Sequence, residues 1–273
     1  MIDKKRIKYL KKKVNNHKIR ALKMCLENGG HISSSFSTAE ILAYLYYQKL
    51  IKKNGNKFIL SKGHGEVLFF SLLADLGYFP DTWLKNSYRK NDCKLGGHVS
   101  SKIPGIEFSS GSLGHGLSFS AGLAYGMKRN KIKKKVFCLM GDGELNEGSV
   151  WEAVIFSSKN NLSNLIALID YNKIGSSDFI KNYISEKPLA LAWKELGWDV
   201  YNSDGHNFTS IHKTLKKVMT NNKKNPSVVI FNTVKGKGVS FIENDPIWHV
   251  KGLDKKLYDL AMQELKIGSN NAS

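Results

Sequence analysis

Long apolar runs are missing from this 273-residue sequence, although 41% of its residues are hydrophobic. No stretch approaches the roughly 18 consecutive apolar residues of a membrane-spanning helix, so we expect no membrane span. The basic first residues, MIDKKRIKYLKKK, lead into no apolar segment of the kind that directs export. Cysteine is scarce too, since Cys25, Cys93 and Cys138 are widely spaced and form no CxxC pair. Reduced thiols and no export signal together predict a cytoplasmic protein.

Arginine is scarce even though the sequence is strongly basic. The formal net charge is +19, yet only four of the 42 basic residues are arginine. Arginine is the side chain that reads base edges and binds phosphates in a bidentate manner, so its scarcity argues against nucleic-acid binding. The lysines are spread over turns and helix faces, which is typical of a solvated surface. A basic nucleic-acid-binding protein therefore stays an alternative that the composition disfavours.

Apolar strands alternate with helical segments along most of the chain. Strands are predicted in KFILS (57–61), VFCLM (136–140), LIALI (165–169), DVYN (199–202) and PSVVIFNTV (226–234). Strands that are apolar throughout indicate a mostly parallel sheet with helices on both faces, which is the α/β class. With no repeat or linker, we predict one domain over residues 1–273. It would begin with a basic helix at about 3–28 and end in a short polar tail at 268–273, with a long loop region at 81–112.

Polar side chains follow the carboxyl ends of these strands, where ligands bind in open α/β sheets. Asp142 lies between two glycines after one strand, Asn172 follows the next strand, and His64 follows another. Asp142, Asn172 and a carbonyl just beyond Asn172 would give Mg²⁺ three oxygen ligands, with a diphosphate and water completing its shell. Either residue alone is better interpreted as a turn cap. The pair, with glycines that let backbone N–H groups approach a phosphate, predicts a metal–diphosphate site.

The Gly-Asp-Gly at 141–143, with Asn172 following 30 positions after Asp142, resembles the thiamine diphosphate motif. Within that superfamily the chain resembles transketolase, because five segments have counterparts in the same order. They are SKGHGEVLFFSLL (61–73), GGH (96–98), SSGSLGHG (109–116), GDGELNEG (141–148) and DYNKI (170–174). The similarity extends from about Ala21 to Gly252 and covers only the diphosphate-binding part. It implies the thiamine-diphosphate-binding fold and the N-terminal subunit of a split transketolase.

The resemblance also assigns ligands residue by residue. It implies that Asp142, Asn172 and the main-chain carbonyl of Ile174 bind Mg²⁺, or Ca²⁺ or Mn²⁺ in its place. The Gly143 N–H would bind the diphosphate of thiamine diphosphate. The Ser-Leu-Gly turn at 112–114, together with the preceding Gly111, would hold the aminopyrimidine ring through Gly111, Leu113 and Gly114.

Four histidines match catalytic or cofactor-contacting histidines of the family. His64 and His249 would contact the diphosphate or the reacting region, and His31 and His98 would line the substrate channel. Two further assignments are weaker or more distant from the chemistry. Arg89 aligns with a substrate-side arginine, and Glu147 matches a glutamate in the acidic network that links paired active sites across a subunit interface.

The resemblance implies a cofactor-dependent transferase of the EC 2.2.1.1 type, which moves a two-carbon ketol unit from a ketose phosphate to an aldose phosphate. The glutamate that activates the cofactor and the phosphate-binding arginines belong to a second domain. A separate C-terminal subunit is therefore expected, as the other half of an α2β2 assembly. A ketolase subunit of a specialised sugar pathway and the α subunit of a 2-oxo acid dehydrogenase are the enzyme alternatives. His115, where glutamine is usual, and serines 33–35, where glycine or proline often stands, depart from the family pattern; we expect the serines to alter the substrate mouth.

Overall fold

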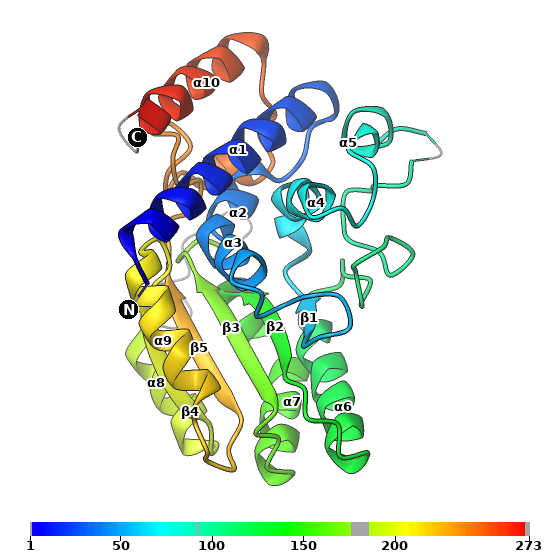
Figure 1. The fold of residues 1–273 in the computed structure, drawn as a ribbon, viewed down its shortest axis with the longest axis vertical. Coiled ribbons are helices and arrows are strands. Elements are labelled where there is room, and N and C mark those ends of the chain that lie inside the picture. The colour runs from blue at the N-terminus through cyan, green and yellow to red at the C-terminus, as the bar shows by residue number, and fades with distance from the viewer. Residues whose placement is uncertain (1, 92, 176–185, 271–273) are drawn as a thin grey trace.

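The computed structural model describes residues 2–91, 93–175 and 186–270. Five strands and ten α-helices are assigned in these ranges, with short 3-10 helices at three strand or loop ends (Figure 1). The helices are α1 (Lys4–Asn28), α2 (Ile32–Phe36), α3 (Ala39–Tyr47), α4 (Glu66–Asp75), α5 (Thr82–Asn86), α6 (His115–Arg129), α7 (Gly148–Lys159), α8 (Glu186–Glu195), α9 (Phe208–Met219) and α10 (Lys255–Asn270). The strands are β1 (Lys57–Leu60), β2 (Val136–Gly141), β3 (Leu165–Tyr171), β4 (Asp199–Asp204) and β5 (Ser227–Asn232), and the 3-10 helices are η1 (Gly63–Gly65), η2 (Asp142–Asn146) and η4 (Pro246–His249).

The five strands form one parallel sheet in the order β1-β2-β3-β5-β4. Because all strands run the same way, their carboxyl ends meet at one edge, where the loops that follow β1, β2, β3 and β5 converge. Register places Gly141 of β2 opposite Asp170 of β3, so the turns after these two strands begin side by side. The predicted parallel α/β sheet is confirmed.

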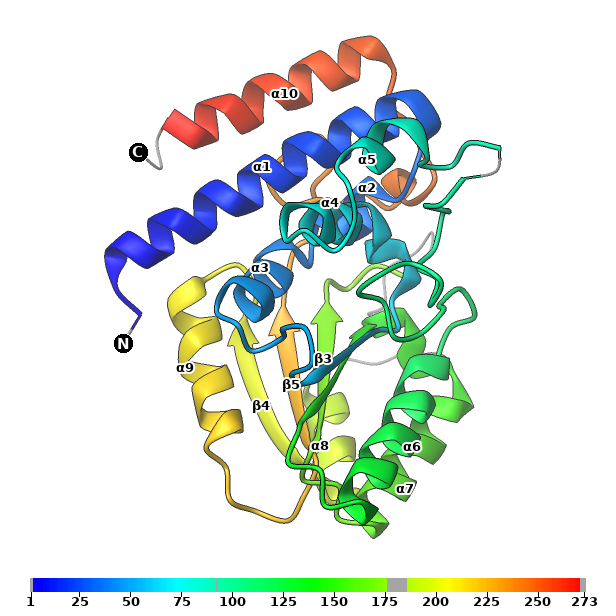
Figure 2. The same ribbon diagram turned by 45° about the vertical axis from the view of Figure 1, so that its right-hand side comes forward.

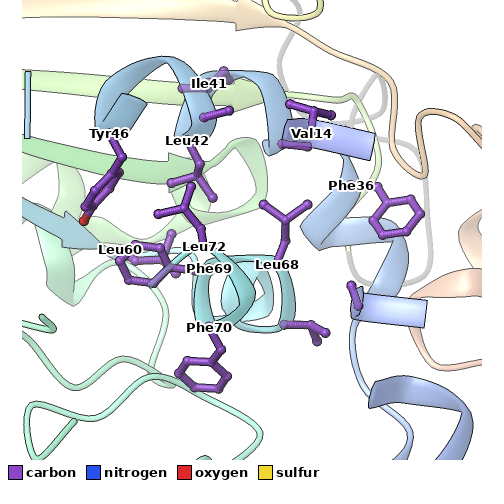
Figure 3. Close-up of a cluster of buried hydrophobic side chains, with 14 of the residues drawn as sticks. Val14, Phe36, Ile41, Leu42, Tyr46, Leu60, Leu68, Phe69, Phe70 and Leu72 are labelled. Atoms are coloured by element: carbon purple, nitrogen blue, oxygen red, sulfur yellow. The ribbon is translucent and has the colours of Figure 1, made fainter. Parts of the chain in front are cut away.

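Each central strand is buried on both faces, which explains its continuous apolar sequence. On β2, Phe137 and Leu139 belong to one hydrophobic cluster, whereas Cys138 and Met140 belong to another. The first cluster is covered by α1, α3, α4 and α9, and the second by α6, α7 and α8. Figure 3 shows part of the first, in which residues of α3, α4 and β1 point toward one another.

Helix α1 starts where the Asp3 side chain accepts a hydrogen bond from the Arg6 N–H, and it runs beside α10 (Figures 1 and 2). It spans Lys4–Asn28, where the sequence suggested a helix at about 3–28. Helix α10 continues to Asn270, so the first half of the expected polar tail is helical, and residues 271–273 lie outside the described ranges. The expected loop at 81–112 contains the five-residue helix α5. No helix in the described part of the chain is long and apolar enough to cross a membrane.

Glycine allows α6 to begin directly against the end of β1. A methyl group on Gly116 would lie 2.3 Å from both Cβ and Oγ of Ser61 and 2.8 Å from its Cα. We therefore expect Gly116→Ala to destabilise the chain by about 1–3 kcal/mol, since backbone or helix must shift. Chemical denaturation of the purified chain measures this.

Two other glycines of α6 provide matched controls. Among the residues that the structure describes, a methyl group on Gly122 or Gly126 meets no atom within 4 Å outside the helix's own backbone. Alanine at either position should stabilise the chain by about 0.4–1 kcal/mol, because it reduces the entropy of the unfolded state. Equal stability of Gly116→Ala and Gly122→Ala would contradict the close contact between α6 and β1.

Candidate active site

Four histidines meet beyond the carboxyl end of β1. His64 lies in η1 and its ring centroid is 4.1 Å from that of His31, 4.9 Å from that of His249 and 5.3 Å from that of His98. His31 precedes α2, His98 lies in the long loop, and His249 ends η4. The fold thus brings together, from four separate segments, all four histidines that the sequence singled out.

Three rings of the histidine cluster have lowered pKa values. Burial, followed by the charge of His31, lowers the pKa of His64 from 6.5 to about 3. Burial and then Lys235 lower the pKa of His249 to about 4, and burial is also the main cause of a lowered pKa at His98. These three rings are neutral at pH 7, so each has one nitrogen that accepts a hydrogen bond or a proton.

Asp142 and Asn172 lie together, as their positions after neighbouring strands predicted. The Lys173 N–H donates to Asp142 Oδ2 at 2.6 Å, which joins the two turns directly. Lys173 has φ 68, and this left-handed turn lets the Ile174 N–H donate to Asn172 Oδ1 at 3.2 Å. The Asn172 amide in turn donates to Asp170 Oδ2 at 2.9 Å. Both side chains are buried at the sheet edge.

Two buried lysines, neither of which the sequence had singled out, complete the charge pattern. Lys62 follows β1 and forms an ion pair with the fully buried Asp170. Lys235 follows β5, and its ammonium donates to the carbonyl of Gly175 at 2.9 Å and, more weakly, to that of Ile174 at 3.4 Å. It also lies 3.2 Å from Nδ1 of His249. Their signal was the one used for Asp142, a charged residue directly after an apolar strand.

The pKa values of Asp142 and Lys235 at this edge of the sheet indicate which charges a ligand could supply. Burial, followed by the charge of Asp170, raises the pKa of Asp142 from 3.8 to about 7. Burial, followed by Lys62, lowers the pKa of Lys235 from 10.5 to about 8. Within the described residues, neither the Asp142 carboxylate nor the Lys235 ammonium forms a salt bridge, and burial disfavours the charged form of each. A divalent cation bound to a diphosphate fits both needs.

The expected cation ligands are oxygens of one carboxylate, one amide and one carbonyl. Within the described ranges, no group of three or more His, Cys, Asp or Glu side chains could hold a metal ion. A cation at Asp142 and Asn172 would therefore need oxygens from a bound anion, as Mg²⁺ takes from phosphates. The residues present fit a metal–diphosphate and do not form an all-protein metal cage.

The Ser-Leu-Gly turn is held to the Asp142 loop by a buried glutamate that sequence reasoning missed. Glu144 accepts hydrogen bonds from the N–H groups of Gly114, at 3.0 Å, and of Gly141, at 2.9 Å, and from the Ser61 hydroxyl. Gly114 has φ 78, and a Cβ there would lie 2.6 Å from Cβ of Glu147. Leu113 is 40% exposed at this turn.

The remaining predicted residues lie around the same edge. The Gly143 N–H donates to Asp142 Oδ1 at 2.9 Å, and a Cβ on Gly111 would lie 3.9 Å from the His98 ring. A Cβ on Gly97 would lie 3.5 Å from Nε of Arg89, which places the guanidinium beside the His98 loop. His115 is exposed at the start of α6.

The serines at 33–35, which depart from the family pattern around His31, are all buried. The Ser33 hydroxyl donates to the Trp248 carbonyl at 2.9 Å, and the Ser35 hydroxyl donates to the His64 carbonyl at 3.2 Å. They therefore hold the segments that carry His64 and His249.

Comparison with known proteins identifies the family. The sequence model described as "Transketolase, thiamine diphosphate binding domain" matches residues 11–271. An apulose-4-phosphate transketolase subunit of Actinobacillus succinogenes is 40% identical over 264 residues, which cover 94% of this chain and 95% of that protein. The 6-deoxy-6-sulfo-D-fructose transketolase subunit SqwG of a Clostridium species is 34% identical, over 87% of this chain and 88% of that protein.

Longer relatives match over part of their length. Human transketolase is 33% identical over 272 residues, which cover 96% of this chain and 43% of that protein. The crystal structure of transketolase from Campylobacter jejuni matches with a TM-score of 0.87 at 26% identity, over 94% of this chain and 42% of that one. This chain spans less than half the length of both. It belongs to the transketolase family, in which it corresponds to the thiamine diphosphate binding domain.

Proposed function

We propose that this chain is the diphosphate-binding subunit of a two-chain transketolase, which transfers a two-carbon ketol unit from a ketose phosphate to an aldose phosphate. One observation carries the proposal. Proteins named as transketolase subunits match this chain nearly end to end, whereas single-chain transketolases are more than twice its length. The rest of the active site would then lie on a separately encoded C-terminal subunit.

The cofactor would be thiamine diphosphate with Mg²⁺, and it supplies the carbanion chemistry of ketol transfer. Asp142, Asn172 and the Ile174 carbonyl would hold the cation. Lys235 would turn from the Ile174 and Gly175 carbonyls to the diphosphate, and its lowered pKa supports this exchange. The Gly143 N–H would bind the diphosphate in place of Asp142 Oδ1 once the cation engages that carboxylate.

The histidine cluster would bind and orient the sugar. His64 and His249, the second of which lies 3.2 Å from the Lys235 ammonium, would contact the diphosphate or the reacting region. His31 and His98 would form hydrogen bonds with substrate hydroxyls or move protons at them, as imidazole side chains do in general acid–base catalysis. Arg89, beside the His98 loop, would lie on the substrate side of the site.

The aminopyrimidine ring would rest on the Ser-Leu-Gly turn. Gly111, Leu113 and Gly114 supply backbone groups and one exposed apolar side chain there. Glu144 fixes this turn relative to Asp142, so the two ends of the cofactor would be held by one rigid unit. The opposite side of the ring would need the partner subunit.

An exposed apolar surface supports assembly. We define the α6–α7 face by Phe119 and Tyr125 of α6 and Ile155 and Phe156 of α7, all at least 38% exposed. The Tyr125 and Phe156 rings lie 5.7 Å apart, so the patch is continuous across both helices. Exposed aromatic patches of this kind mark protein interfaces.

We propose that a second copy of this chain covers the α6–α7 face. Glu147, the first residue before α7, lies at the end of this face nearest the Ser-Leu-Gly turn. That position suits a carboxylate that links two paired active sites across the interface. With one C-terminal subunit per copy, the assembly would be an α2β2 heterotetramer.

The sugar could belong to a specialised pathway rather than to central pentose phosphate metabolism. The two relatives of similar length are named for apulose 4-phosphate and 6-deoxy-6-sulfo-D-fructose. The assay for donor identity uses the co-purified complex of this chain with its C-terminal subunit. It compares xylulose 5-phosphate with those two sugars as donors. Transfer from any ketose donor supports the proposed function, and absence of transfer from all ketoses by the intact complex would refute it.

A further inference from the structure

Glu66 is a fully buried carboxylate beside the histidine cluster, at the first position of α4. Its Oε1 lies 3.1 Å from Nδ1 of His31 and accepts a hydrogen bond from the Tyr88 hydroxyl at 3.3 Å. Its Oε2 has no hydrogen-bond partner within the part of the chain that the structure describes. A buried carboxylate with one oxygen unsatisfied is costly and calls for a functional explanation.

The charge of Glu66 is matched by no lysine or arginine in ion-pair contact within the described residues. Its contact with a basic side chain there is the hydrogen bond to the imidazole of His31, whose side chain is 20% exposed. Burial of an unpaired carboxylate normally destabilises a fold by several kcal/mol. A leucine at this first position of α4 would be buried at a lower cost in free energy, so the carboxylate calls for a functional explanation.

The local backbone is shaped to keep His31 on Glu66. Gly30 has φ 142, and a Cβ there would lie 2.3 Å from the Tyr88 hydroxyl and 2.9 Å from Sγ of Cys25. Only glycine allows the chain to pass this close to Tyr88 and then deliver His31 to the carboxylate. Tyr88 is itself fully buried, so its hydroxyl is fixed as a second donor to Glu66.

We propose that Glu66 is a positioning residue that fixes the tautomer and ring orientation of His31. The ring would carry its proton on Nδ1, which donates to Oε1, and would present the lone pair of Nε2 to the site. An acceptor nitrogen at this place receives a proton or hydrogen bond from a sugar hydroxyl, whereas the other tautomer would offer a donor. The interaction of Nε2 with a sugar hydroxyl rests on the proposed function. The assignment of the His31 tautomer is independent of it.

The first test reads the tautomer in the purified, ¹⁵N-labelled chain without substrate. Two-bond ¹H–¹⁵N correlations distinguish a protonated from an unprotonated ring nitrogen, and the His31→Gln variant identifies the His31 signals. We expect protonated Nδ1 and unprotonated Nε2 at about pH 7.5. Glu66→Gln should retain this tautomer because the amide oxygen still accepts the bond, whereas Glu66→Leu should lose it.

A wild-type spectrum with the proton on Nε2 would overturn the proposal, as would a Glu66→Leu spectrum unchanged from wild type. If Glu66→Leu fails to fold, the wild-type spectrum and Glu66→Gln still decide. Tyr44→Phe is the matched control, because it removes a hydroxyl 2.8 Å from a ring nitrogen of His212, outside the site. It should leave the His31 signals unchanged.

The second test uses the complex with the C-terminal subunit. Glu66→Leu should lower kcat/KM on the order of 10- to 100-fold, as loss of other carboxylates that orient histidines does. Glu66→Gln should stay within about threefold of wild type, since the tautomer is preserved. Equal loss in both variants would contradict a tautomer-setting role. Failure of every variant and of wild type to transfer ketol units would count against the proposed function, while the spectra would still decide the inference.

Discussion

Replacing Asp142 by asparagine is expected to weaken the joint binding of thiamine diphosphate and Mg²⁺ by about 100-fold or more, because the proposed cation site would lose its carboxylate ligand. Burial, followed by the charge of Asp170, raises the pKa of this carboxyl to about 7, and a bound cation would offset both effects. Isothermal titration of the chain, or of its complex, with both components present measures the loss.

Asp142→Asn should also change the free energy of unfolding. The sign of this change distinguishes the variant from one that is merely destabilised. Without a cation, the folded chain keeps the Asp142 proton to about pH 7, whereas the unfolded chain releases it near pH 4. The wild-type free energy of unfolding therefore falls by on the order of 4 kcal/mol as pH rises through this window. Asparagine does not titrate, so the free energy of unfolding of Asp142→Asn should increase relative to that of wild type as pH rises over the same range.

Asp204→Asn provides the matched control, because Asp204 ends β4 and is exposed. It should bind the cofactor as wild type does. Wild-type cofactor affinity in Asp142→Asn would show that Asp142 is not a cation ligand. A stability difference between variant and wild type that stays constant from about pH 4 to pH 7 would contradict the raised pKa of the buried Asp142 carboxyl.

A single charge on the α6–α7 face is expected to prevent pairing of two copies. Phe156→Glu places a carboxylate in the centre of that face, beside the Tyr125 ring. If a second copy covers it, desolvation of this charge should raise the dissociation constant about 30-fold or more, since aromatic interface anchors contribute about 2 kcal/mol or more. Sedimentation velocity of the assembled complex should show the α2β2 species replaced by one of half its mass.

Leu260→Glu is the matched control for that experiment. Leu260 lies on α10, beside α1 and away from α6 and α7, and it is 42% exposed, as Phe156 is. It should assemble normally. An unaltered mass for Phe156→Glu would show that the face is free in the complex, and equal disruption by both substitutions would indicate a general effect of added charge.

The convergence of Asp142, Asn172 and His64 could be anticipated because its signal is local. Asp142, Asn172 and His64 each follow an apolar strand, and parallel strands bring such positions to one edge. Lys62 and Lys235 obey the same rule but were overlooked, since lysine after a strand carries little information in a chain with net charge +19. The roles of all these residues remain predictions, whereas their convergence is a property of the fold.

The buried polar partners could not be anticipated, because they depend on contacts between distant segments. Asp170 sits inside an apolar strand and meets Lys62, which is 108 positions away. Glu66 looks like an ordinary acid in the first turn of a helix, where it would favour the helix dipole. Its contact with His31 exists only because α4 packs against the turn at Gly30.

The central claim is that half of a ketol-transferring active site resides on this chain. The direct measurement is ketol transfer in three samples, each with thiamine diphosphate and Mg²⁺: this chain, its separate C-terminal partner, and the two mixed. We expect no transfer from either protein alone and full transfer from the mixture. Full transfer by this chain alone would contradict the claim, as would an inactive mixture in which the two chains demonstrably bind each other.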